Sequence, residues 1–148
     1  MPQAGKIVRK IAIARFTQTL GSATKGGIPI LQALAVSANT AGNQVIRNAI
    51  RNVASNVQEG TELAPPLDAT GEFPPMVIRM IAAGEKSGNL PLMLDEITRF
   101  YERDVEYSVQ KFTRLLEPLM TVLVGLIVLF VLLALYMPIF NLGNVIKR

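Results

Sequence analysis

Few side chains in this sequence could carry out chemistry. The chain has no cysteine and no histidine, so it lacks a thiol nucleophile and the commonest metal ligand and general base. The glycine-rich run from Gly21 to Gly27 fails the phosphate-loop pattern, because it lies on a helical pattern with no strand before it. We therefore expect no catalytic residue, no cofactor site and no metal site.

Glu85 is the most unusual carboxylate, because it stands between Gly84 and Gly88 where two apolar helices are expected to meet. Glycines allow close backbone approach and positive φ, and we expect positive φ at Gly84, Gly88 or both. A carboxylate in such a turn can accept hydrogen bonds from the N–H groups that begin the next helix. Two interpretations stay open, a helix-capping acid and the base of a membrane-bound enzyme.

Other charges gather on helical faces. The predicted last helix before the apolar segment carries an acidic cluster, in which Asp95 and Arg99 have the spacing of a helical ion pair. The cluster is a salt-bridged solvated face or a rim that docks a basic partner. Arg47 and Arg51 lie on a basic, Asn-rich face of another predicted helix. Glu117 stands alone just before Pro118, as an interfacial polar residue or as a carboxylate that pairs with Arg114 or a partner chain. The acidic cluster comprises Asp95, Glu96, Glu102, Asp104 and Glu106.

These residues must be positioned by a chain that ends in a long apolar segment. Residues 118–146 contain no charged residue, and fifteen of residues 119–140 are Leu, Ile, Val or Phe. About 20 such residues span a bilayer as a helix, so we predict a transmembrane helix at 118–140. The alternative is a buried core helix of a soluble domain, which a chain this short rarely encloses on all sides.

The charge distribution predicts how that helix is oriented. Arg99, Arg103, Lys111 and Arg114 precede the apolar segment, and all eleven acidic residues also lie before it. By the positive-inside bias, residues 1–117 form a cytoplasmic domain and 141–148 a short tail on the far side. We expect no signal peptide, because basic residues interrupt the start of the chain. The sequence has no Lys/Arg-rich run of the kind that indicates nucleic-acid binding.

Residues 1–117 have the apolar spacing of helices, without period-two alternation. We predict an all-α protein, an antiparallel helical bundle followed by the C-terminal transmembrane helix. Gly26 and Gly27 should end the first helix and Asn43 should cap the third. Pro65-Pro66 and Pro74-Pro75 leave room for at most a short helical turn between the two pairs. The next helix should stop at Gly84, and Pro118 should bend or weaken the last one.

Three stretches in this order and spacing resemble one family. The first runs from Ala14-Arg15-Phe16 to Gly27-Ile28-Pro29, and the second from Phe73-Pro74-Pro75 through Gly84-Glu85-Lys86-Ser87-Gly88-Asn89-Leu90. The third opens with Leu116-Glu117-Pro118 and closes with Tyr136-Met137-Pro138. Together they are similar to the inner-membrane platform protein of type IV pilus and type II secretion machines, slightly more to its pilus branch.

The resemblance implies a second cytoplasmic domain plus the last transmembrane helix of that family, as a fragment or a natural short form. It also implies a bacterial inner-membrane location, no enzymatic activity, and coupling of a cytoplasmic assembly ATPase to pilin or pseudopilin insertion. The partners are other inner-membrane components and further copies of the chain. The expected motif and interaction residues are Arg15, Phe16, Gly27, Pro29, Gly84, Glu85, Gly88, Leu90, Glu117, Pro118 and Pro138.

Two departures from the family pattern concern Lys86, which replaces a frequent second acid, and Pro65-Pro66, which puts a family helix in doubt. A generic membrane-anchored adaptor or receptor is the alternative function, and its partners would be unrelated to filaments. The sequence does not separate pilus from secretion machine, nor does it give the oligomer number or the partner contact residues.

Overall fold

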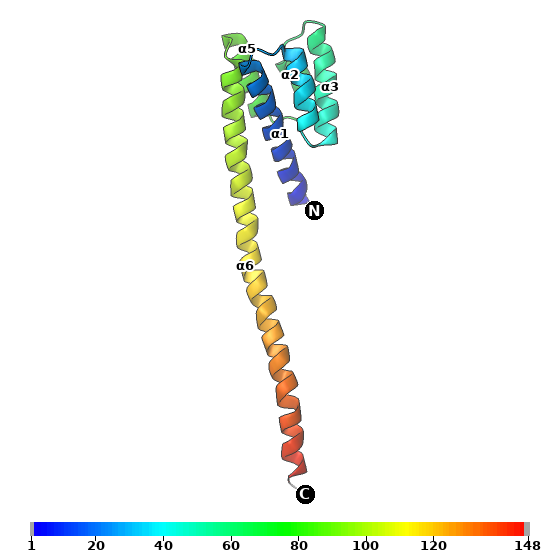
Figure 1. The fold of residues 1–148 in the computed structure, drawn as a ribbon, viewed down its shortest axis with the longest axis vertical. Coiled ribbons are helices and arrows are strands. Elements are labelled where there is room, and N and C mark those ends of the chain that lie inside the picture. Colours follow the sequence, from blue (N-terminus) through cyan, green and yellow to red (C-terminus); the bar gives the residue numbers. More distant parts are fainter. Residues whose placement is uncertain (1, 147–148) are drawn as a thin grey trace. The chain divides into compact units, whose positions relative to one another are not determined.

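The structure is a computed structural model that describes residues 2–146, with side chains described from Ala4 onward. All regular secondary structure in the described part is helical, with no strand among these residues, which confirms the predicted all-α fold. The described residues form six helices, and Figure 1 colours them along the chain from blue to red. They are α1 (Pro2–Lys25), α2 (Ile30–Thr40), α3 (Gln44–Gln58), α4 (Ala64–Ala69), α5 (Pro75–Ser87) and α6 (Leu90–Val145).

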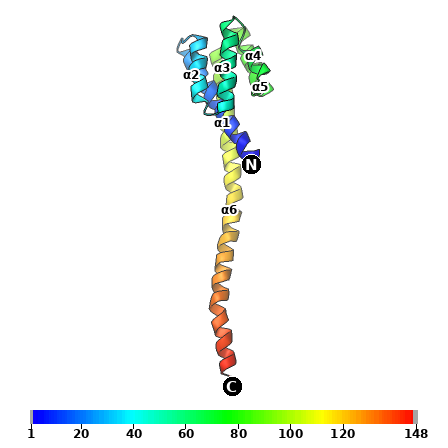
Figure 2. The same cartoon turned by 90° about the vertical axis from the view of Figure 1, so that its right-hand side faces the viewer.

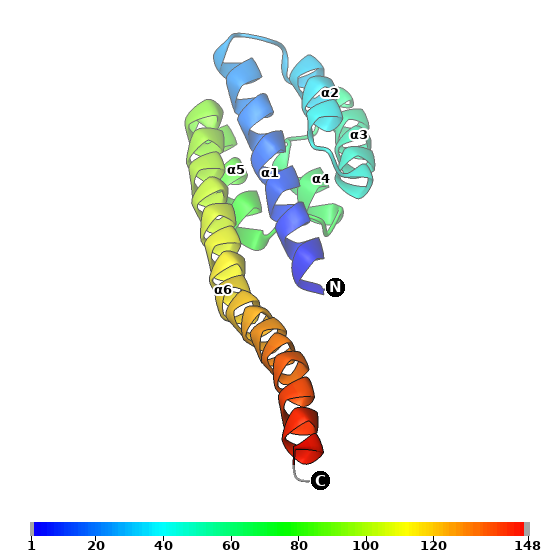
Figure 3. The same ribbon diagram turned by 60° about the horizontal axis from the view of Figure 1, so that its bottom comes forward.

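The chain divides into two compact units, residues 1–107 and residues 108–148. In the first unit, hereafter the bundle, α1 lies between the start of α6 and the α2–α3 pair (Figure 3). Figure 2 shows α3 between α2 and the α4–α5 pair, in agreement with the contacts of α2 with α3, α3 with α4, and α4 with α5. The early residues of α1 meet later residues of α6, so these two helices are antiparallel.

The bundle is held by one apolar core, to which every one of its helices contributes. Phe16 is fully buried, and its ring lies 5.4 Å from that of Phe73 between centroids. Burial of a large apolar side chain stabilises a fold by about 2 kcal/mol. The largest fully buried side chains are Phe16, Ile13, Leu20, Leu34, Ile46, Ile50, Leu63, Leu67, Ile81, Leu94, Ile97 and Val53.

Helix ends follow local chemistry at two predicted places. Asn43 caps α3, since its Oδ1 accepts hydrogen bonds from the N–H groups of Val45 at 2.9 Å and Ile46 at 3.3 Å. Gly27 follows the end of α1 with φ +81°, a backbone conformation that glycine adopts without strain. Both predictions are confirmed.

Two expected boundaries are wrong. Helix α5 does not stop at Gly84 but continues to Ser87, because Gly84 is a packing residue rather than a helix terminator. Helix α4 does not lie between the proline pairs. It begins at Ala64 and takes Pro65-Pro66 into its first turn, where the missing proline N–H groups cost no hydrogen bond. The helix placed in doubt by these prolines is therefore present.

The second unit consists of the later part of α6. Residues 109–146 are all exposed, and the most apolar stretch of α6 has a mean hydropathy of 2.9 with none of it buried. By length and composition α6 can cross a membrane, as predicted. Pro118 and Pro138 lie inside the helix without ending it, and α6 continues beyond residue 140 to Val145.

Candidate interaction surfaces

Glu85 joins two segments of the bundle that are distant in sequence. Its Oε1 accepts a hydrogen bond from the Leu63 N–H at 2.5 Å, and its Oε2 accepts one from the Ala64 N–H at 3.1 Å. These are donors at the start of α4, which otherwise has no side-chain cap. The carboxylate is thus a capping acid, but the expectation that it caps the following helix is wrong. It lies within α5 and caps a helix more than twenty residues earlier.

Gly84 and Gly88 play different roles at the turn between α5 and α6. A Cβ on Gly84 would lie 3.0 Å from the Leu90 Cα and 3.0 Å from the Met93 Cγ. Gly84 therefore lets the start of α6 approach the backbone of α5. Gly88 caps α5 with φ +71°, so the expectation of positive φ at one of the two glycines is confirmed at Gly88. Leu90 is the first residue of α6.

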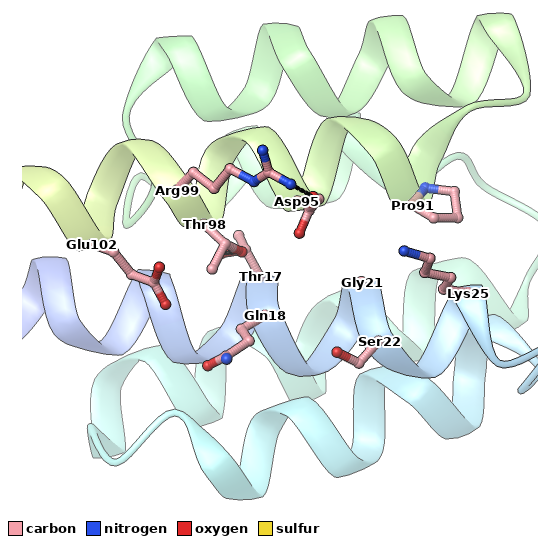
Figure 4. Close-up of a pocket in the computed structure, with 10 residues that line it drawn as sticks. All are labelled: Thr17, Gln18, Gly21, Ser22, Lys25, Pro91, Asp95, Thr98, Arg99 and Glu102. Carbon is pink, nitrogen blue, oxygen red and sulfur yellow. Dashed lines mark hydrogen bonds and ion pairs between the residues drawn. The ribbon is translucent and has the colours of Figure 1, made fainter.

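A polar groove of about 260 Å³ runs between α1 and α6 within the bundle (Figure 4). At its floor the Thr17 and Thr98 hydroxyls lie 2.9 Å apart. On one wall Arg99 donates to Asp95 at 2.9 Å, which confirms that expected pair. The groove combines carboxylates and cations with hydroxyl and amide side chains, so it suits polar contacts. Its lining is Thr17, Gln18, Gly21, Ser22, Lys25, Pro91, Asp95, Thr98, Arg99 and Glu102.

Two ion pairs link α1 to later elements. Lys10 Nζ lies 2.8 Å from Asp104 Oδ2, and Arg9 lies 3.3 Å from Glu72. Arg9 also donates to the backbone carbonyls of Gly71 and Glu72. Burial, and secondarily the Asp104 charge, raise the pKa of the nearby Tyr101 hydroxyl. These contacts orient α1 rather than activate a reacting group.

A second groove, of about 200 Å³, lies between α2 and α3. We call it the α2–α3 groove. Arg51 is exposed on one wall. One turn earlier, Arg47 donates to Gln44 at 3.3 Å, while its Nε is buried without a hydrogen-bond partner in the described part. The lining residues are Leu34, Ala35, Ala38, Asn39, Arg51 and Ala54.

The expected motif residues of the first two helices lie in the bundle. Arg15 is exposed, and its Nη1 would lie 3.0 Å from a Cβ on Gly42. Phe16 is in the core. Pro29 precedes α2, and its carbonyl accepts the Ala33 N–H at 2.9 Å. These positions meet structural requirements; a binding role for any of them is a proposal.

The expected membrane-boundary residues lie on exposed positions of α6. Glu117 forms no ion pair with Arg114 among the described residues. Its backbone carbonyl accepts a hydrogen bond from the Thr121 hydroxyl at 3.1 Å. Over residues 2–146 there is no group of three or more potential metal-ligating side chains.

Sequence reasoning missed the contacts that join distant segments. The amides of Leu63 and Ala64 carry no side-chain signal, and nothing in the local sequence pairs Lys10 with Asp104. The helical-pair rule could recover only the Asp95–Arg99 pair, because those residues are four apart on one helix.

Comparison with known proteins gives one consistent family. A family model described as "Type II secretion system (T2SS), protein F" matches residues 16–138. The type IV pilus assembly protein PilC of Myxococcus xanthus is 42% identical over 99% of this chain and 35% of its own length. The type II secretion system protein F of Pseudomonas aeruginosa is 40% identical over 99% of this chain and 36% of its own length. The chain thus spans little more than a third of these relatives.

Proposed function

The chain belongs to the type II secretion system protein F family, and from that premise we propose that it is an inner-membrane platform protein for type IV pilus assembly or type II secretion. The observation that carries the proposal is the family match through both the bundle and the apolar helix. An exposed apolar helix following a packed helical bundle is suited to a platform that is anchored in the membrane and receives other proteins at its surface.

The proposed mechanism is mechanical rather than catalytic. The bundle would contact a cytoplasmic assembly ATPase, and α6 would lie against pilins, pseudopilins or other inner-membrane components of the machine. Several cations before the apolar segment support a cytoplasmic bundle by the positive-inside bias. In the polar groove between α1 and α6, Asp95 and Arg99 form an ion pair on one wall, an arrangement suited to structural or docking contacts.

The relatives support both machines almost equally. The two most informative identities are 42% for a pilus assembly protein and 40% for a secretion protein, so the slight preference for the pilus branch stays a prediction. A generic adaptor or receptor is disfavoured by the family match along residues 16–138. We therefore propose one platform role and leave the served filament to experiment.

Co-purification from a native membrane tests the proposal. The full chain carries an affinity tag, membranes are solubilised gently, and partners are identified by mass spectrometry. An assembly ATPase together with pilins or pseudopilins should be enriched. The matched control is an unrelated tagged protein with one transmembrane helix, expressed at the same level. Equal recovery of these partners with the control, or enrichment of proteins unrelated to filaments, would contradict the proposal.

Orientation is tested separately by thiol labelling, which the absence of cysteine makes simple. A Ser55→Cys chain has one thiol, on the exposed face of α3. A membrane-impermeant maleimide should label it in inverted membrane vesicles and leave it unlabelled in intact spheroplasts. The opposite labelling pattern would place the bundle outside the cytoplasm.

A further inference from the structure

The later part of α6 has very few charged side chains. Lys111 and Arg114 are the only cations of residues 108–146, and Glu117 is the only acid. All three are exposed, and none of them forms an ion pair with another described residue. The segment therefore carries two cations next to its apolar stretch that no described acid neutralises.

The two cations share one face of α6. Lys111 and Arg114 are three residues apart, which makes their side chains neighbours on a helix. The opposite side of this turn is apolar, since Phe112 and Leu116 are 58% and 41% exposed there. Glu117 follows Arg114 by another three residues. It thus lies beyond Arg114 as seen from Lys111, and it does not occupy the space between the two cations.

The position of these cations along the helix matches the headgroup layer of a bilayer. The predicted span begins at Pro118, and α6 passes through this residue without ending. At about 1.5 Å per residue, Arg114 and Lys111 precede Pro118 by roughly 6 and 11 Å. The headgroup layer on each side of the hydrocarbon core is roughly 5–8 Å thick. Arg114 thus falls within this layer, and the long side chain of Lys111 extends to it.

We propose that Lys111 and Arg114 together bind the headgroup phosphate of an anionic phospholipid, while Phe112 and Leu116 insert among acyl chains on the other side of the helix. The planar guanidinium of Arg114 matches a phosphate with paired hydrogen bonds, and the Lys111 ammonium adds a second positive charge. A phospholipid is the occupant because the apolar segment that follows requires a bilayer around it. The lipid is anionic because a zwitterionic headgroup brings its own cation, which these two side chains repel.

The inference rests on the proposed membrane anchoring of α6 and adds a choice of lipid to it. The positive-inside bias orients a helix by the distribution of Lys and Arg, and it requires no contact with a particular headgroup. A phosphate held between Lys111 and Arg114 would also fix the depth at which α6 enters the bilayer. The proposal therefore predicts a preference between lipids, which orientation alone does not.

Tryptophan fluorescence of the purified full-length chain in bilayers tests this preference, because the sequence has no native tryptophan. Leu115→Trp places the probe at an exposed position, one turn from Lys111. The bilayers contain equal parts of phosphatidylglycerol and phosphatidylcholine, and either one lipid or the other carries brominated acyl chains, which quench tryptophan on contact. Quenching should show phosphatidylglycerol enriched about fivefold over phosphatidylcholine, as one net positive charge near the membrane surface predicts.

Three control variants are measured in the same bilayers. Phe130→Trp places the probe at an exposed position in the uncharged part of α6, and both lipids should quench it equally. Changing Lys111 and Arg114 to Gln in the Leu115→Trp chain should abolish the preference. Glu117→Gln in that chain should increase the preference instead, because it removes the only negative charge of this turn.

Equal quenching of Leu115→Trp by the two lipids would overturn the proposal and would indicate that the cations bind a protein partner. A preference that survives the double change to Gln, or that is as large at Phe130→Trp, would overturn it as well. These outcomes would leave the platform function standing. Absence of quenching at Phe130→Trp by both lipids would instead contradict the membrane anchoring, and the proposed function would fail with it.

Discussion

The bundle and the later part of α6 place the same kinds of apolar residue in opposite environments. In the bundle, apolar side chains are buried against one another, as Phe16 and Leu20 are. From residue 109 to residue 146 every side chain is exposed, although this segment is the more apolar of the two. The apolar side chains of the bundle are therefore removed from water by the bundle itself. The apolar segment of α6 needs an apolar environment outside the chain, which the interior of a bilayer provides.

Polar side chains in the two regions also differ in the hydrogen bonds that their surroundings require. In the bundle, some polar side chains act between helices, as Glu85 does at the start of α4, and others donate to a carbonyl of their own helix, as Ser37 does. In the apolar part of α6, Thr121 donates to a carbonyl of its own helix, which is the arrangement that lipid requires of a polar side chain. Changes in the two regions should therefore affect different measurements.

The largest effect is expected from charges placed in the apolar part of α6. Leu129→Lys should cost about 3 kcal/mol of membrane insertion, and adding Leu132→Lys should roughly cancel the insertion free energy. Resistance of the protein to alkaline extraction from membranes measures this loss. The control is Ser55→Lys with Gln58→Lys on the exposed face of α3, which should extract like the parent. If the intact parent is soluble and monodisperse without detergent, the membrane assignment fails.

The next effect concerns the core of the bundle. Phe16→Ala removes a fully buried ring that contacts Phe73 and should lower the free energy of unfolding by about 4 kcal/mol. Denaturant unfolding of the full chain in detergent, followed by far-ultraviolet circular dichroism, measures it. Phe130→Ala, in the exposed part of α6, is the matched control and should leave the bundle transition unchanged. Equal losses for both variants would abolish the distinction between the two regions.

A smaller loss is expected at the carboxylate that joins α5 to α4. Glu85→Ala leaves the Leu63 and Ala64 N–H groups without their acceptor and should cost about 2 kcal/mol of unfolding free energy. Glu85→Gln keeps one acceptor oxygen and should lose roughly half as much. Lys86→Ala, at the exposed neighbouring position, should change stability by less than about 0.5 kcal/mol. If Glu85→Ala lowered the free energy of unfolding no more than Lys86→Ala does, the cap at the start of α4 would contribute nothing to stability.

The contacts of Glu85 with a distant helix could not be predicted from the sequence. Periodicity and local caps predict the helices of the bundle, the cap at Asn43 and the span in α6, because each depends on residues within a few positions. The role of Glu85 depends on folding that brings Leu63 and Ala64 to it, and no local pattern encodes that. For the same reason Gly84 was expected to end a helix. Gly84 has no room for a side chain because Leu90 and Met93 pack on it, and they do so only in the folded chain.

The smallest expected effect is a change in the free energy of unfolding when a glycine is replaced by alanine, and its sign depends on the backbone conformation at that glycine. Gly88 has φ +71° with open space where a Cβ would lie, so Gly88→Ala meets no neighbour and should lose about 1 kcal/mol of unfolding free energy through backbone strain alone. Gly5 also has open space around it but lies inside α1. There Gly5→Ala should gain up to about 1 kcal/mol, because alanine has less backbone freedom to lose on entering a helix. Thermal unfolding of both variants measures the pair, and the same added methyl group should move the transition in opposite directions. A gain at Gly88 would mean that the turn between α5 and α6 does not hold positive φ in solution. The close approach that Gly84 permits would then have to be maintained by side-chain packing alone.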